Sequence, residues 1–119
     1  MTDSIIKEKS RTFAINIINL CRNVSKEHNE YVLTKQLLRS GTSIGANVAE
    51  GIRGQSKADF YSKMSIALKE ASETAYWLVI MNATGYLTDS AFEAANMDCE
   101  ELIRILVSIT KKTKGGVTE

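Results

Sequence analysis

The chain contains no proline, although average usage would place about six in a protein of this length. Proline interrupts helices because it lacks the backbone N–H and clashes with the preceding turn. Its absence therefore permits long, unbroken helices. The chain also has a single histidine, His28. A di-iron site in a helical bundle needs more than one imidazole ligand, and a nucleophilic triad would have no histidine other than His28 to act as its base. These absences favour a protein that is not an enzyme and that carries neither a metal nor a cofactor.

Cysteine is also scarce. Cys21 and Cys99 stand far apart without a C-x-x-C spacing, so they form neither a zinc ligand set nor a redox motif. We interpret both as buried thiols in a reducing cytosol, with a bridge between them as the alternative. No apolar run approaches the roughly 18 residues that a membrane span needs, and the polar start MTDSIIKEKSRTF has no signal-peptide core. We expect a cytoplasmic protein without a membrane partner.

Neither sign of charge dominates, because 15 Lys and Arg residues oppose 14 Asp and Glu residues. The net charge of +1 gives the whole molecule no general attraction to nucleic acid. A local basic cluster does occur in the first predicted helix, and its members are Lys7, Lys9, Arg11, Arg22 and Lys26. The preferred interpretation is a solvated basic face, and the alternative is a nucleic-acid site on this helix.

With 44% hydrophobic and 24% charged residues, the composition is that of an ordinary globular protein. Apolar residues recur at alternating three- and four-residue steps in four segments, which indicates four amphipathic helices. Breaks are predicted at residues 26–29, at 54–56 with Ser56 as an N-cap, and between a left-handed Gly85 and a cap at 88–90. Such short connections predict an all-α, antiparallel, up-down-up-down four-helix bundle. It forms one domain over residues 1–119, with a frayed tail from about residue 112.

The second predicted helix, from about Glu30 to about Gly51, contains two glycines in its middle. Gly41 and Gly45 together cost a helix roughly 2 kcal/mol relative to alanine. We expect these small residues to allow the backbone of a neighbouring helix to approach closely. The alternative is that they form a recognition surface. A phosphate-binding loop is disfavoured because the GK[ST] ending of that motif is missing. A polar stripe, expected to make buried or interfacial hydrogen bonds, runs along the same helix through Gln36, Ser40, Ser43, Asn47 and Glu50.

The third predicted helix carries a second apolar stripe beside its core seam, formed by Ile66, Glu70, Glu73, Trp77 and Ile80. A solvent face would not carry two isoleucines and a tryptophan, so the stripe indicates self-association. The two glutamates need donors, and we expect these from Arg22, Arg39 or Arg53.

Residues 33–51, LTKQLLRSGTSIGANVAEG, together with Asp59-Phe60 and residues 66–78, IALKEASETAYWL, resemble the 23S rRNA-intervening sequence proteins over about residues 10–110. The matching positions are Gln36, Arg39, Ser43, Asn47, Glu50, Gly51, Glu70, Glu73 and Trp77. The resemblance implies a small cytoplasmic bacterial bundle that assembles as a ring-shaped homopentamer and has no enzymatic activity. We expect the matched side chains to be structural or to lie at the subunit interface.

Members of the resembled family include proteins encoded within ribosomal RNA genes. Related accessory variability determinants of diversity-generating retroelements bind nucleic acid and a reverse transcriptase through a strongly basic surface, from which the +1 charge of this chain departs. The leading hypothesis is therefore a structural or scaffolding ring without a small-molecule substrate. The alternative is an accessory factor that binds RNA or DNA and is linked to a ribosomal RNA intervening sequence or a reverse transcriptase.

Overall fold

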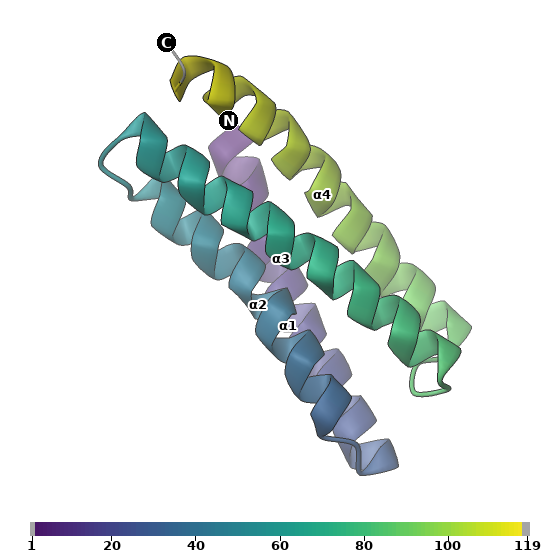
Figure 1. The fold of residues 1–119 in the computed structure, drawn as a ribbon. Coiled ribbons are helices and arrows are strands. Elements are labelled where there is room, and N and C mark those ends of the chain that lie inside the picture. The colour runs from purple at the N-terminus through teal and green to yellow at the C-terminus, as the bar shows by residue number, and fades with distance from the viewer. Residues whose placement is uncertain (1, 118–119) are drawn as a thin grey trace.

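Four long helices make up the computed structural model, which describes residues 2–117 (Figure 1). They are α1 (Thr2–His28), α2 (Val32–Ile52), α3 (Lys57–Ala83) and α4 (Asp89–Val117). No strand occurs within these residues. The all-α four-helix bundle predicted from the periodicity is therefore confirmed.

The helices lie side by side in a closed cycle. Contacts join α1 to α2, α2 to α3 and α3 to α4, and a sparser set joins α1 to α4. The bundle is elongated, with extents of 50 × 22 × 20 Å. Among the described residues, the backbones of α1 and α3, and those of α2 and α4, do not approach each other closely, so the α1–α2 side and the α3–α4 side lie on opposite sides of the bundle.

The core is built from one seam of each helix, as the three- and four-residue steps predict. Fully buried members include Ile17 of α1, Ile44 of α2, Leu78 of α3 and Leu106 of α4. Each such side chain stabilises the fold by about 1.5–3 kcal/mol when it leaves water. The seams therefore fix which side of each helix remains free for other contacts.

Helix ends follow local side-chain chemistry. The Ser56 hydroxyl accepts a hydrogen bond from the N–H of Asp59 at 3.0 Å, and Gly85 has a φ of +87°, so both predicted end signals are confirmed. An unpredicted cap begins α2. The Glu30 carboxylate accepts hydrogen bonds from the N–H groups of Val32, Leu33 and Thr34 at 2.9–3.0 Å.

One predicted boundary is wrong. The break expected at residues 26–29 begins only at Asn29, whose φ of +51° ends α1, so His28 belongs to the helix. Its ring packs edge-on against Tyr86 with centroids 5.3 Å apart, which holds this last turn in place. α4 is helical as far as Val117, and the Thr113 hydroxyl donates to the Ile109 carbonyl; fraying of the tail from about residue 112 stays a prediction.

Candidate functional site

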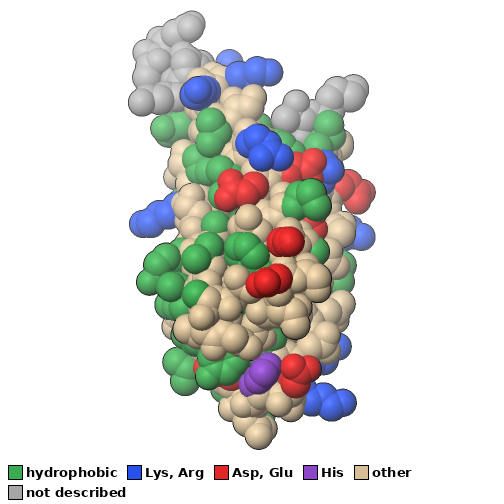
Figure 2. Space-filling view, turned by 90° about the vertical axis from the view of Figure 1, so that its right-hand side faces the viewer, with side chains coloured by type: hydrophobic (Ala, Val, Ile, Leu, Met, Phe, Trp, Pro, Cys, Tyr) green, Lys and Arg blue, Asp and Glu red, His purple; other side chains and the backbone are tan. Residues whose placement is uncertain are grey.

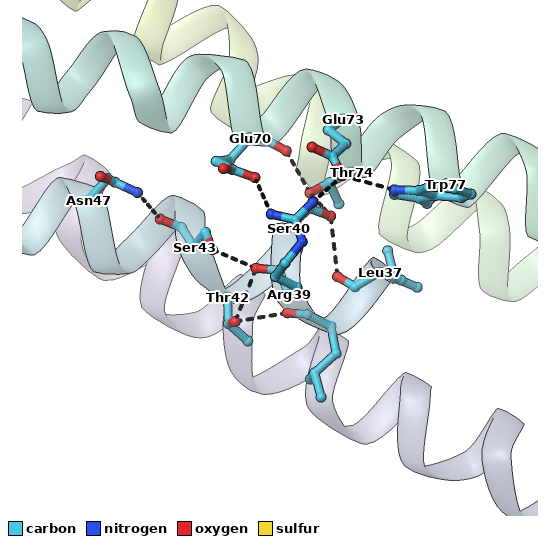
Figure 3. Close-up of polar contacts among 11 residues, drawn as sticks. Leu37, Arg39, Ser40, Thr42, Ser43, Asn47, Glu70, Glu73, Thr74 and Trp77 are labelled. Atoms are coloured by element: carbon cyan, nitrogen blue, oxygen red, sulfur yellow. Dashed lines mark hydrogen bonds and ion pairs between the residues drawn. The ribbon is translucent and has the colours of Figure 1, made fainter. Parts of the chain in front are cut away.

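Arg39 of α2 meets the two glutamates of the second α3 stripe in one network (Figure 3). Of the three candidate arginines, Arg39 is the partner. Its guanidinium lies 3.3 Å from Glu70 Oε1 and also contacts Glu73. Glu73 in turn accepts a hydrogen bond from the indole N–H of Trp77 at 3.1 Å. The network therefore ties α2 to α3 and orients the indole ring.

Solvent reaches this network from one side. The Arg39 side chain is 48% exposed and that of Glu70 is 19% exposed. Ion pairs that remain this open to water contribute about 0–1 kcal/mol each. The arrangement holds side chains in place, and it lacks the enclosure that a buried catalytic carboxylate needs.

Beneath the ion pairs, two hydroxyls meet in the core. Ser40 and Thr74 are both fully buried, and their oxygens are 2.9 Å apart. The Thr74 hydroxyl is also 2.8 Å from the Glu70 carbonyl oxygen. This pair sets the level at which α2 and α3 face each other.

The other members of the α2 stripe bond mainly within their own helix. Ser43 donates to the Arg39 carbonyl at 2.6 Å, and Asn47 donates to the Ser43 carbonyl at 2.8 Å. Glu50 forms an ion pair with Lys63 of α3 at 2.9 Å. Gln36 is half-buried and takes no part in these bonds. The stripe thus divides into residues that join α2 to α3 and residues whose polar groups remain accessible.

The helix-breaking glycines of α2 face α1. A Cβ on Gly41 would lie 2.9 Å from Ile17 Cγ2, and one on Gly45 would lie 3.3 Å from the Ser10 carbonyl oxygen. The close approach of α1 explains why alanine is missing at these two positions. It belongs to the packing of the bundle and leaves no groove there for a ligand.

The second stripe of α3 is only partly free. Ile66 is exposed, whereas Trp77 and Ile80 are half-buried. Two further apolar residues that the sequence analysis did not single out, Tyr76 and Val79, are at least half exposed. A helical wheel drawn beyond the predicted stripe would have found them, because both lie outside the core seam. The outer side of α3 therefore carries exposed apolar residues interspersed with exposed polar ones, Ser62, Lys69 and Ser72.

All five predicted nucleic-acid residues are exposed on α1, but they do not share one face. Arg11, Arg22 and Lys26 recur at helical spacing on the outer side, with Lys7 one turn before Arg11. Lys9 faces α4, where its ammonium forms an ion pair with Glu101 at 3.3 Å. The structure thus gathers four of the five cations along one stripe and separates the fifth.

The chemistry available to the described residues is limited. Within residues 2–117, no three His, Cys, Asp or Glu side chains are placed to hold a metal ion. Both cysteines are free and buried. Burial, with a smaller effect of Glu30, raises the pKa of Cys21 to about 11, and burial beside Glu100 raises that of Cys99 to about 12. Neither thiol is an activated nucleophile.

None of the helices in residues 2–117 combines the length and the apolar character that crossing a bilayer requires.

Comparisons with known proteins agree with the fold. The family model described as 23S rRNA-intervening sequence protein matches residues 2–108. A crystal structure of a protein of unknown function from the S23 ribosomal protein family of Bacteroides thetaiotaomicron is 49% identical, with a TM-score of 0.91. That match covers 93% of this chain and 99% of the other. No curated protein matches the chain.

Proposed function

Because the chain belongs to the 23S rRNA-intervening sequence protein family, we propose that it works as a non-enzymatic scaffold, a ring-shaped homo-oligomer of antiparallel, up-down-up-down bundles. Five copies, as the resemblance implies, make the ring. It acts in the cytoplasm without a cofactor, a small-molecule substrate or a membrane partner.

The exposed apolar residues on the outer side of α3 carry this proposal. Ile66, Tyr76 and Val79 remain exposed although the bundle core is complete, and Trp77 and Ile80 are half-buried beside them. Exposed apolar surface of this extent is unfavourable in water, and contact with another copy would remove it. The neighbouring Arg39 network stiffens the helix pair that presents the surface.

Light scattering coupled to gel filtration tests the assembly. Five copies of a 13.2 kDa chain give a particle of roughly 66 kDa at micromolar concentration. Placing charges on one exposed side of α3 with Tyr76→Glu and Val79→Glu should release 13.2 kDa monomers that keep their helical circular dichroism. These two positions test the contact more cleanly than Trp77→Glu, because the Trp77 indole also bonds Glu73 within the bundle.

Ile5→Glu with Ile15→Glu is the matched control, since it puts the same two charges at exposed isoleucines of α1. It should leave the particle intact. A wild-type protein that runs as a monomer would refute the proposal.

The basic stripe of α1 supports a second candidate, an accessory factor that binds RNA or DNA. Its four cations are Lys7, Arg11, Arg22 and Lys26. A ring would repeat this stripe around its circumference, so that avidity would compensate for weak contacts in each copy. Mobility-shift binding to RNA should then weaken by orders of magnitude between about 50 and 200 mM salt. Charge reversal at Lys7 and Arg11 should lower the affinity without changing the oligomer, whereas unchanged binding would reject this candidate.

A further inference from the structure

An apolar groove opens between α1 and α2. Ile18, Tyr31 and Leu38 line it, and each of these side chains is exposed. The groove encloses about 400 Å³. Two cations, Arg22 and Lys35, also line it; among the described residues no acidic side chain does so, although the Glu30 carboxylate accepts a hydrogen bond from the N–H of Thr34, which lies at the groove. It is suited to a partner surface that is apolar at its centre and acidic at its edge.

The opposite side of the bundle has that character. Tyr76 and Val79 of α3 and Met97 of α4 are 57%, 50% and 66% exposed. Glu93 and Glu100 flank Met97 at four and three residues' distance, so all three lie on the outer side of α4, where the exposed Arg104 follows one turn after Glu100. Figure 2, which views the molecule from the side where α4 lies in Figure 1, shows hydrophobic side chains along the left flank and acidic ones beside them. We call this surface the α3–α4 face.

The orientation of Val79 follows from the polar network. Glu73 and Trp77 are turned toward α2 by the contacts of Arg39. Val79 comes two residues after Trp77, about 200° further round the helix, and therefore faces away from α2 and toward the α4 side. On α4, Asp98 lines the groove beside α1, so Met97 projects outward.

The groove and the α3–α4 face lie at the same level along the bundle. The bond between Ser40 and Thr74 places Leu38 level with Tyr76, since each is two residues from the bonded pair. The Cys99 thiol donates to the Ala71 carbonyl at 3.3 Å, and α4 runs back along α3 (Figure 1), so Met97 lies within about one turn of the same level.

The four charges are free to pair with another molecule. Within the part of the chain that the structure describes, none of Arg22, Lys35, Glu93 and Glu100 takes part in an ion pair. Two cations beside an apolar groove therefore stand opposite two anions beside an apolar face. Complementary charges of this kind guide association and set its register.

We propose that the α1–α2 groove of one copy receives the α3–α4 face of the next. The inference rests on the proposed homo-oligomer and names the two surfaces that meet in it. Because they are different surfaces, the contact is heterologous, and heterologous contacts generate rings when the rotation closes. The groove and the α3–α4 face lie at the same height along the bundle. This suits a ring whose axis is parallel to the helices, because each copy then binds the next without being shifted along that axis.

A charge exchange tests the pairing by sedimentation velocity across a concentration series. Arg22→Glu with Lys35→Glu makes the groove acidic, and Glu93→Lys with Glu100→Lys makes the face basic. Each pair of substitutions should raise the dissociation constant about tenfold or more, because like charges then meet. All four substitutions together should restore assembly, since opposite charges face each other again.

The matched control for the groove variant is Lys57→Glu with Lys112→Glu, which lowers the charge of the chain by the same amount at two exposed lysines outside both surfaces. Circular dichroism of every variant checks that the bundle is folded. A further measurement needs no substitution, because raised salt should weaken wild-type assembly if these charges pair across the contact.

The outcomes separate the two proposals. If the wild-type protein is oligomeric and both charge variants assemble as the control does, or the fourfold variant stays folded but dissociated, the pairing is wrong while the oligomer stands. If the groove variant loses RNA binding and keeps its assembly, the groove cations serve nucleic acid and the pairing is again wrong. If the wild-type protein is monomeric, the proposed function fails and this inference fails with it.

Discussion

Replacing Thr74 by valine keeps the shape of a fully buried side chain and removes its hydroxyl. The change breaks the 2.9 Å contact with Ser40 and leaves the Ser40 hydroxyl only a 3.4 Å contact with the Leu37 carbonyl. An unsatisfied buried polar group costs about 1–3 kcal/mol, so Thr74→Val should lower the free energy of unfolding by that amount. Ser40→Ala should cost about 0.5–1.5 kcal/mol, since Thr74 retains its bond to the Glu70 carbonyl.

The double variant decides whether the two hydroxyls act as a pair. With both removed, no partner is left unsatisfied, so the total loss should be smaller than the sum of the single losses by about 1 kcal/mol. Urea unfolding followed by circular dichroism, at one fixed protein concentration, measures each value. Ser43→Ala, a half-buried serine that bonds only within α2, is the control and should change stability by less than about 0.5 kcal/mol. Losses that simply add would refute the coupling.

Four further predictions concern single sites. Gly41→Ala should destabilise the bundle by about 1–3 kcal/mol in urea unfolding, because the new Cβ meets a branched, buried isoleucine of α1; a stabilised variant would show that α1 can withdraw at little cost. Arg39→Ala should cost only about 1 kcal/mol, since the ion pairs are open to solvent, and a loss of several kcal/mol would show that they are sealed in the assembled protein. Partial burial raises the pKa of Glu30, but three backbone N–H donors outweigh it and hold the pKa below its ordinary 4.5. The stabilisation by its charged form is complete above that value and disappears as the pH falls through the lowered pKa, so Glu30→Gln should cost about 1 kcal/mol at pH 7 and less at pH 3; an equal cost at both values contradicts this. Thiol labelling at pH 8 should be slow at Cys21 and Cys99 and faster by orders of magnitude in urea, and rapid labelling of the folded protein would contradict the raised pKa values.

Features fixed by local chemistry could be predicted from the sequence. The spacing of apolar residues locates the seams, and Ser56 and Gly85 mark helix ends whichever helices pack nearby. The cap that Glu30 makes was missed because a glutamate is not a usual N-cap residue, and here it reaches the first turn of α2 from a position outside the helix.

Features that depend on how two helices face each other could not be predicted. Three arginines were candidates for Glu70 and Glu73, and only the level of α2 against α3 selects Arg39. The close approach of α1 to α2 was expected from Gly41 and Gly45, but the groove beside it was not. Its exposed Ile18 and Leu38 lie just off the core seams, and their exposure depends on how far each helix is rotated about its own axis.

The sparse edge between α1 and α4 has a consequence for how the bundle forms and opens. The other three edges join helices that are neighbours along the chain, so their contacts close short loops and can form early in folding. The α1–α4 edge joins the two ends of the sequence, gains the fewest contacts and should close last. Amide protons of the core turns around Phe13 and Leu102 should then exchange through a partial opening of this edge, before the whole bundle unfolds. The bundle would then open first where α4 meets α1. Helices α1, α2 and α3 would stay packed as a three-helix unit while α4 separates from α1.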